Sequence, residues 1–217
     1  MIKVTLSAPP HNFELKVKRP GELFLLGTPS PAGTDWDGHD YWRAVHKYLY
    51  RSHKGICFYC ASYSPRSGHD KDRNTSVDHW LPKSARPDLA YEWTNFRLCR
   101  IRLNRRKADH QDLIDPCNAS SNWFEIQFTT FLLVPSPGLP TSLELAVRRT
   151  IAILMLNDDQ DYLDERSEVI LQYSQGKLTF TQLQQNYPFI AYQMIKHNFD
   201  LNYRARIKQI ADQRSIL

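Results

Sequence analysis

The sequence predicts an α+β protein, and three segments carry the signal. Alternating apolar residues in Phe13-Glu14-Leu15-Lys16-Val17 favour extended structure near the N-terminus. Residues 123–134 are rich in Phe, Ile, Thr and Val and also favour β structure. Residues 141–217 carry helical periodicity that is interrupted mainly at Gly176 and Pro188. We therefore expect an N-terminal extended wrap and a C-terminal, mostly helical annex.

The N-terminal part is expected to lead into a helix. Residues up to about Thr34 combine alternating runs with Pro and Gly, which favours turns and extended chain around the core. From Asp40 to Ser52 the apolar side chains recur at helical spacing and predict an amphipathic helix, which Gly55 ends. These side chains are Tyr41, Trp42, Val45, Tyr48 and Leu49.

The centre of the chain predicts loops, a short strand and a helix. Residues 62–74 are polar and contain glycine, so they predict an exposed loop before a strand candidate at residues 76–80. A further loop and the segment Tyr91–Leu98 follow. They precede a helix-prone run, Cys99–Asp109, which contains neither Gly nor Pro.

Composition excludes some classes of protein. The 217 residues carry a net charge of +5, which permits a polyanionic partner without demanding one. No stretch approaches the ~18 apolar residues of a membrane span. The N-terminus MIKVTLSAPPHNF also lacks the build of a signal peptide. We therefore expect a cytoplasmic protein that makes no membrane contact.

The four cysteines are too few for a disulfide framework in a chain of this length. The spacing Cys57-Phe-Tyr-Cys60 suits a metal clip or a redox pair, and Cys99 and Cys117 could complete a set of four. That spacing is not the spacing of a zinc knuckle, and the pair lacks the helix start that lowers a thiol pKa. We favour buried free thiols over a structural Zn²⁺ at Cys57 and Cys60, and either over redox chemistry.

Asp78 and His79 supply two parts of a one-metal hydrolase. A carboxylate binds a hard divalent cation, and a neutral imidazole can take a proton from water. Neighbouring side chains on a strand point to opposite faces, so both serve one site only if the chain bends ahead of Pro82. Asn104 and Lys107 share one face of the following helix, which could hold metal and phosphate together.

Each of these features alone is also common in structural settings, but their joint order resembles the signature of the HNH, or ββα-metal, nucleases. The order is Cys57-x-x-Cys60, Val77-Asp78-His79-x-x-Pro82-Lys83-Ser84, Asn95, and Asn104-x-x-Lys107. The resemblance covers the chain from about Gly55 to Pro116. It implies a β-hairpin that carries the Asp-His pair and packs on a helix that carries the final Asn.

The resemblance also implies a role for each matching residue. Asp78 and Asn104 would bind one Mg²⁺ or Mn²⁺ ion, and His79 would be the general base that activates the attacking water. Asn95 would hold the loop that carries His79, and Lys107 would contact phosphate. The chain would then be a hydrolase that cuts DNA. Because an ordinary histidine has a pKa near ~6.5, we expect activity to fall below neutral pH.

The densest basic run of the chain lies beside the implied metal site. It comprises Arg97, Arg100, Arg102, Arg105, Arg106 and Lys107. Attraction to phosphate explains this placement, so we expect Arg97, Arg100, Arg105 and Arg106 to contact DNA. Some of these arginines are instead expected to pair with the acidic residues just downstream, Asp109, Asp112 and Asp115.

The resemblance has one departure and one loose extension. A second CxxC pair would fall at Arg100 and Leu103, which cannot bind metal, so a zinc clip is incomplete. The layout of the whole chain also resembles HNH proteins that are encoded beside ATPases in bacterial anti-phage systems. That likeness implies an ATPase or other defence-system partner. Apolar stripes of the annex are most simply core, or else a surface for that partner or for a second copy.

We therefore expect three parts: residues 1–54 as wrap and lead-in helix, 55–117 as the HNH nuclease core, and 118–217 as a β segment and helical annex. Two alternatives remain open. One is a non-catalytic DNA-binding module that keeps the ββα shape and binds without metal. The other is a nuclease subunit that stays latent until an ATPase docks on its annex.

Overall fold

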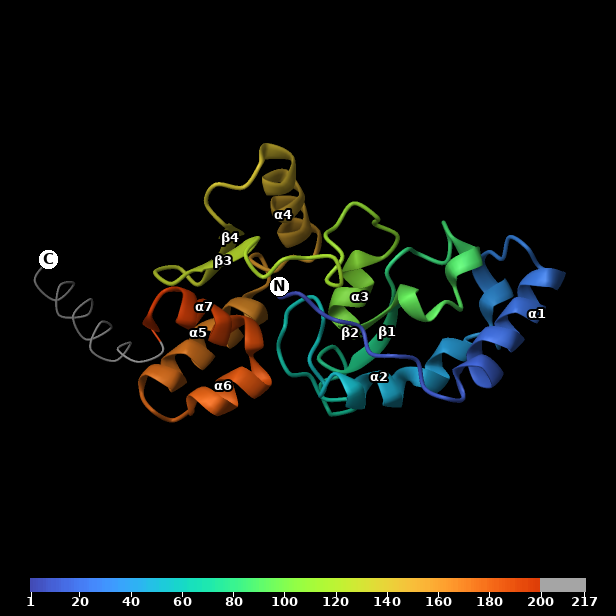
Figure 1. Ribbon diagram of the computed structural model, residues 1–217, viewed down its shortest axis with the longest axis horizontal. Coiled ribbons are helices and arrows are strands. Elements are labelled where there is room, and N and C mark those ends of the chain that lie inside the picture. The colour runs from blue at the N-terminus through green and yellow to red at the C-terminus, as the bar shows by residue number, and fades with distance from the viewer. Residues whose placement is uncertain (200–217) are drawn as a thin grey trace, which may run out of the picture. The chain divides into compact units, whose positions relative to one another are not determined.

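The computed structural model of the protein describes residues 1–199. It combines helices with two separate two-stranded antiparallel sheets, which confirms the predicted α+β class (Figure 1). The chain divides into two compact units, Lys3–Ala119 and the part from Ser120 onward together with Met1 and Ile2. None of the described helices is long and apolar enough to cross a membrane.

The N-terminal segment is helical where the alternating pattern favours extended chain. A π-helical turn, η1 (Glu14–Lys18), runs into α1 (Arg19–Gly27). Phe13 and Val17 alternate as in a strand but are also one helical turn apart, and the structure buries both while it leaves Leu15 exposed. The expected extended wrap is therefore wrong over η1 and α1, because a short run fits a period of two and a helical face equally well.

Residues ahead of η1 do wrap the first unit. The amide of Val4 donates to the carbonyl of Pro116 at 2.9 Å, which ties the start of this unit to its end. The indole Nε1 of Trp93 donates to the carbonyl of Ser7 at 2.6 Å. The part of the expected wrap that precedes η1 is thus fixed by backbone and side-chain hydrogen bonds.

A helical segment connects α1 to the first sheet. It comprises two 3-10 turns, η2 (Gly33–Trp36) and η3 (Tyr41–Val45), and helix α2 (His46–Ser52). The helix predicted over residues 40–52 is confirmed, with a tighter first turn. Gly55 has a φ of 71°, a left-handed conformation that glycine adopts without strain and that turns the chain away from α2.

The next elements form one hairpin-and-helix unit. Strand β1 (Thr75–His79) pairs antiparallel with β2 (Phe96–Arg100), and Asp78 lies opposite Arg97. Helix α3 (Ile101–Lys107) begins directly after β2. Between the strands lie two further 3-10 turns, η4 and η5, at Pro87–Leu89 and Trp93–Asn95. The strand and helix expected around residues 76–80 and 99–109 are therefore both present, and β2 supplies the second strand.

The hydrophobic core lies on one face of this hairpin. Val77, Phe96 and Leu98 point into it and pack with residues from α1, η2, η3 and α2. The other buried members are Phe13, Val17, Trp36, Val45, Leu49, Phe58, Ala90, Tyr91 and Trp93. Because side chains alternate along a strand, the opposite face carries Asp78 and Arg97. The core thus fixes which side chains of the hairpin face α3.

Up to residue 199, the second unit contains a hairpin and four helices. Strand β3 (Phe124–Gln127) pairs with β4 (Leu132–Pro135), as the apolar β-prone segment predicts. The helices are α4 (Thr141–Ile153), α5 (Gln160–Ser174), α6 (Phe180–Asn186) and α7 (Pro188–Lys196). The breaks expected at Gly176 and Pro188 are confirmed, and a further break separates α4 from α5. The expected helical residues 200–217 lie outside the described part of the chain.

Candidate active site

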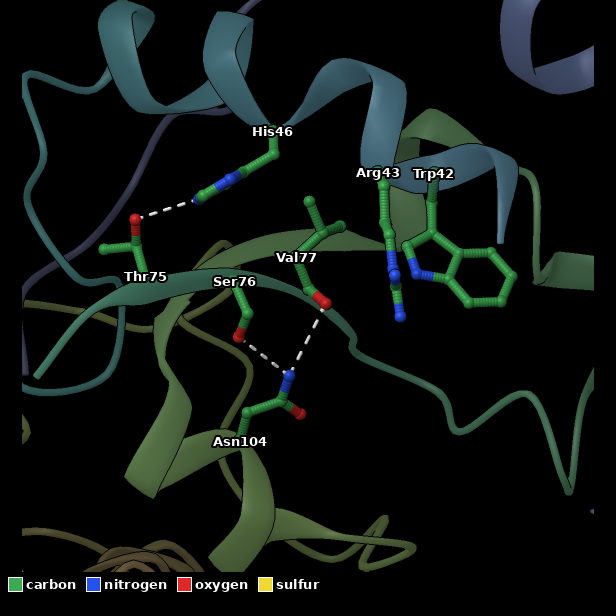
Figure 2. Close-up of a pocket in the computed structure, with 7 residues that line it drawn as sticks. All are labelled: Trp42, Arg43, His46, Thr75, Ser76, Val77 and Asn104. Carbon is green, nitrogen blue, oxygen red and sulfur yellow. Dashed lines mark hydrogen bonds between the residues drawn. The ribbon is translucent and has the colours of Figure 1, made fainter. Parts of the chain in front are cut away.

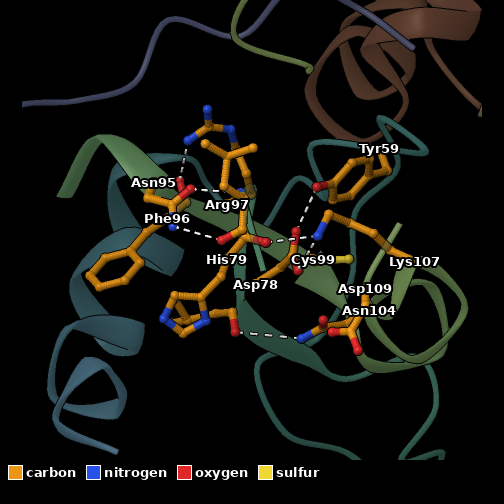
Figure 3. A network of polar contacts seen from close by, with 12 residues as sticks. Tyr59, Asp78, His79, Asn95, Phe96, Arg97, Cys99, Asn104, Lys107 and Asp109 are labelled. Carbon is orange, nitrogen blue, oxygen red and sulfur yellow. Dashed lines mark hydrogen bonds and ion pairs between the residues drawn. The ribbon is translucent and has the colours of Figure 1, made fainter. Parts of the chain in front are cut away.

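Asp78 is sealed inside the hairpin-and-helix unit. Its Oδ2 accepts a hydrogen bond from the hydroxyl of Tyr59 at 2.5 Å, and its Oδ1 lies 3.3 Å from the Nζ of Lys107 (Figure 3). Lys107 also donates to the carbonyl of His79 at 2.7 Å. The side chains of Asp78 and Lys107 are 3% and 0% exposed. The two charges therefore form a buried ion pair between β1 and α3.

Electrostatics explains why these three side chains occur together. Burial raises the pKa of Asp78, and the neighbouring ammonium of Lys107 and hydroxyl of Tyr59 hold that pKa down. Burial, followed by the charge of Asp78, raises the pKa of Tyr59 well above its ordinary value, so Tyr59 stays a hydrogen-bond donor. A buried carboxylate needs such partners, since an unpaired buried charge is strongly destabilising.

His79 leaves β1 on the face opposite Asp78. Its Nε2 lies 2.8 Å from the carbonyl oxygen of Ala90, and its ring packs edge-to-face on Trp42 and Phe96 with ring centroids 4.7 and 5.4 Å away. A carbonyl oxygen can only accept, so Nε2 carries the proton and Nδ1 keeps a free lone pair when the ring is neutral. The bend that would bring Asp78 and His79 to one site is absent from β1.

Burial also changes the expected titration of His79. Desolvation lowers the pKa of this imidazole to about 4, although the hydrogen bond to Ala90 acts in the opposite direction. The expectation of an unperturbed histidine is therefore corrected, and the fall of activity below neutral pH stays a prediction. His79 is neutral throughout the physiological range because its charged form cannot be hydrated.

Asn95 braces the loop between the two strands. Its Oδ1 accepts from the amide of Leu81 at 2.8 Å, and its Nδ2 donates to the carbonyls of Leu81 and Leu89 at 3.0 and 3.1 Å. The side chain is buried at the end of η5, so these hydrogen bonds are shielded from water. One amide thus holds Leu81, which follows His79 closely in the chain, and Leu89, which directly precedes Ala90, the partner of His79. These are the contacts that the implied role of Asn95 requires.

Asn104 projects from α3 toward the other end of β1. Its Nδ2 donates to the hydroxyl of Ser76 at 3.0 Å and lies 3.5 Å from the carbonyl of Val77. None of the hydrogen bonds found between described residues uses its side-chain Oδ1. Asp78, Asn104 and Lys107 therefore come to the same face of the hairpin, with Asn104 toward Ser76 and Lys107 beside Asp78.

The donor types of Asp78 and Asn104 suit a hard divalent cation, but their arrangement does not. Both oxygens of Asp78 are engaged by Tyr59 and Lys107. Among the described residues, no group of three or more His, Cys, Asp or Glu side chains could hold a metal ion. Because the ammonium of Lys107 already neutralises Asp78, the residues do not fit a bound Mg²⁺ or Mn²⁺ in this arrangement.

Two of the four arginines expected at DNA have structural partners instead. Arg97 is 3% exposed and makes a bidentate ion pair with Asp115 at 2.8 and 2.7 Å. Arg100 is 2% exposed and donates to the hydroxyl of Ser64 and the carbonyl of Tyr63 at 2.6 and 3.0 Å. The structure therefore corrects their expected contact with DNA, because both guanidinium groups are buried and donate to groups inside the protein.

The other two arginines lie on the accessible side of α3. Arg105 is exposed and pairs with Asp72 at 2.7 Å, and Arg106 is half-buried. An exposed ion pair of this kind contributes about 0–1 kcal/mol, so a phosphate could compete for the guanidinium of Arg105. The contact of Arg105 and Arg106 with nucleic acid stays a prediction.

The cysteines are free in the structure. Cys57 and Cys99 are fully buried, and burial raises the pKa of the Cys57 thiol to about 12 and also raises that of Cys99. Burial raises the pKa of Cys117 to about 11. Cys60 is half-buried. Thiols with raised pKa values are poor nucleophiles, which agrees with the preference for free thiols over redox chemistry. A structural zinc at Cys57 and Cys60 stays untested.

Several residues of this region escaped the sequence analysis. Tyr59 lies inside the Cys57-Phe-Tyr-Cys60 motif, where the cysteines drew attention and the hydroxyl carried no signal of its own. Trp42 was expected only as an apolar helix position, yet its ring contacts His79. Ser76 also had no signal, since its contact with Asn104 joins segments that are distant in sequence.

The sequence matches no known protein-family model, and no curated protein is similar to it at a significant level.

Proposed function

We propose that this chain is an endonuclease of the HNH type that hydrolyses DNA in a divalent-metal-dependent reaction. The single observation that carries the proposal is the environment of His79. A buried, neutral imidazole is oriented by the carbonyl of Ala90 and is left with one free nitrogen. A fixed tautomer, a fixed ring and a lone pair are features that a general base needs. The pKa of about 4 makes this imidazole a weaker base than an ordinary histidine.

The remaining residues of the hairpin-and-helix unit support the same proposal. Asn95 fixes the loop that presents Ala90 to His79, so it acts as a positioning residue. Asn104 and Asp78 offer oxygen donors on one face, as the resemblance to the HNH family implies. A divalent ion could be held there only after Tyr59 and Lys107 release Asp78, and it would then supply charge stabilisation for the phosphate and the leaving oxygen. The exposed Arg105 is the proposed phosphate contact of α3.

The sealed state of Asp78 favours a second candidate, a nuclease that stays latent until a partner docks. Lys107 and Tyr59 would have to release Asp78 before a cation could bind it. The proposed partner is an ATPase or other subunit of a bacterial anti-phage system that binds the helical annex. This candidate differs from the first in regulation and keeps the same chemistry.

The placement of Asp78 and His79 on opposite faces of β1 favours a third candidate, a DNA-binding module without catalysis. His79 and Asp78 point away from each other, so the strand does not join base and metal ligand in one cluster. Such a module would bind DNA in the absence of metal, and replacement of His79 would change stability only.

Plasmid cleavage separates these candidates. Purified full-length protein is incubated with supercoiled plasmid and Mg²⁺ or Mn²⁺, beside His79→Ala, Asn104→Ala and an EDTA control. We expect cleavage by the wild type to fall at least about 100-fold in His79→Ala, the scale of a lost general base. His11→Ala, which changes an exposed histidine outside this unit's core, is the matched control and should cut normally.

Each alternative has its own result in this assay. Full cleavage by a folded His79→Ala protein would exclude His79 as the base. If the wild type binds plasmid in EDTA and never cuts, even after extract from the source cells is added to the reaction with metal, the result favours the non-catalytic module. Cutting that appears only with extract from the source cells supports the latent nuclease. Circular dichroism of each variant confirms that the fold is retained.

A further inference from the structure

A pocket of about 390 Å³ lies along the edge of β1 that β2 leaves uncovered (Figure 2). Its lining comes from η3 and α2 on one side, from β1 in the middle and from α3 on the other. Arg43 and Trp42 reach down from η3, and Asn104 reaches toward β1 from α3. The pocket therefore sits where the two faces of the hairpin meet.

The charge of this pocket favours an anion. Arg43 and His46 belong to the lining, and none of the described residues that line the pocket carries a carboxylate. Arg43 pairs with Asp40, outside the lining, at 2.6 Å, but its side chain is 79% exposed, so the pair is screened by solvent. Burial and then the positive charge of Arg66 lower the pKa of His46, so the positive charge of the lining comes from Arg43 and His46 serves as a neutral hydrogen-bonding group.

The walls also offer hydrogen-bonding groups for phosphate oxygens. The hydroxyls of Thr75 and Ser76 line the pocket beside the imidazole of His46 and the amide of Asn104. His46 Nε2 lies 2.9 Å from Thr75 Oγ1, and Asn104 Nδ2 lies 3.0 Å from Ser76 Oγ. Each hydroxyl is thereby held in place from a second element. Preorganised hydroxyls and guanidinium groups are typical partners of phosphate in proteins that bind DNA.

Size and shape point to more than an inorganic ion. The volume falls in the range of roughly 300–1,000 Å³ that is typical of pockets for small organic ligands. The indole of Trp42 forms one wall and offers an apolar surface to a sugar or a base. The same ring contacts His79 with centroids 4.7 Å apart, so the pocket borders the proposed general base.

We propose that this pocket is the subsite for a phosphodiester of the DNA strand, with Arg43 as its main charge contact. Thr75 or its partner His46 would donate to the phosphate oxygens, and Trp42 would contact the attached nucleoside. The inference rests on the proposed function, since it names the substrate contact of the same unit. It also assigns a binding role to η3 and α2.

The test is the salt dependence of DNA binding. A short fluorescein-labelled duplex is titrated with full-length protein in EDTA at several KCl concentrations, and its anisotropy gives Kd. We expect Arg43→Gln to weaken binding about tenfold and to lower the slope of log Kd against log salt by about 0.9, the loss of one phosphate contact. Arg51→Gln, an equal charge change on an exposed residue of α2, should leave both unchanged.

Cleavage measured on the same variants separates the pocket from the nuclease. If the wild type cuts DNA, and Arg43→Gln has the Kd, salt slope and KM of the wild type, the pocket assignment is overturned while the nuclease stands. If the wild type never cuts, but Arg43→Gln lowers the salt slope by about 0.9 and Arg51→Gln does not, the pocket stands and the nuclease fails. Equal losses in Arg43→Gln and Arg51→Gln would mean a diffuse positive field, which also overturns the subsite.

Discussion

At the scale of single residues, the decisive contact is the ion pair between Asp78 and Lys107. Both residues could be singled out in the sequence, Asp78 beside His79 and Lys107 on the face of Asn104. Their mutual contact could not, because it depends on how closely α3 packs on β1. The pair occupies the place where the resemblance alone would put a metal ion.

Lys107→Met should destabilise the fold by about 3 kcal/mol, since it leaves the carboxylate of Asp78 buried without its counter-charge. Urea denaturation followed by circular dichroism measures this loss. Lys47→Met, at an exposed position of α2, should change the stability by less than about 0.5 kcal/mol. In the double variant with Asp78→Asn, the cost should be well below the sum of the single costs. Additive costs would contradict the pair.

The lowered pKa of His79 predicts a loss of stability in acid. The unfolded histidine titrates near ~6.5 and the folded one near 4, so the unfolded chain binds the extra proton between these values. The contribution is complete above the unfolded pKa and is lost as pH falls toward 4, by roughly 3 kcal/mol in total. His79→Gln should therefore show a shallower fall of unfolding free energy over this range than the wild type. Parallel curves would show that His79 is not buried in its neutral form.

At the scale of elements, the first strand of the hairpin and the helix after it could be predicted from the residue patterns, the hairpin itself was implied only by the family resemblance, and the N-terminal helix was not predicted. Residues 76–80 carry a strand signal and the run after Cys99 a helical one, in the order that the structure has. Phe13 packs on Trp93 and Phe96, and Val17 is buried in the same cluster, which favours the helical conformation of this segment. Local alternation over so few residues cannot report such a tertiary contact.

Asn95 gives the sharpest test of the loop between β1 and β2. Asn95→Ala removes three hydrogen bonds to backbone groups of Leu81 and Leu89 and should destabilise the fold by about 2–4 kcal/mol. Hydrogen exchange should show the amide of Leu81 exchanging at least about tenfold faster. Thr94→Ala, at the exposed neighbouring position, should leave that amide protected. An unchanged exchange rate of the Leu81 amide in Asn95→Ala would show that Asn95 does not hold this loop in place.

At the scale of the whole molecule, the first unit contains its own core and the candidate site. The cluster around Val77, Phe96 and Leu98 draws every member from within Lys3–Ala119. The expected boundary near residue 117 follows from the end of the motif and the change to β-prone sequence. The expected separation of residues 1–54 from the nuclease core does not describe this unit, since α1, η3 and α2 supply part of its core.

A fragment of residues 3–119 is therefore expected to fold without the second unit. It should melt in one cooperative transition by circular dichroism and keep a native fluorescence spectrum from its buried Trp36 and Trp93. A fragment that melts without cooperativity, or that exposes these tryptophans to quenchers, would contradict the division of the chain. The fragment Asp78→Asn serves as a destabilised comparison.

The burial of individual basic residues could not be predicted from the sequence. Arg97, Arg100 and Arg105 have the same charge and lie within one run, but only packing tells which is inside. Arg97 and Arg100 are buried and belong to β2, and Arg105 is exposed on α3. Likewise, the lead-in helix could be predicted as amphipathic, while the pocket that its polar side forms with β1 and α3 could not.

The most direct test of the proposed nuclease is the Mg²⁺ dependence of DNA hydrolysis by the full-length chain and its Asp78→Asn variant. We predict that the wild type cuts plasmid with a saturable dependence on Mg²⁺, and that EDTA and Asp78→Asn each abolish cutting in folded protein. Hydrolysis by Asp78→Asn at the wild-type rate, or hydrolysis that is equal with and without divalent ion, would contradict the account.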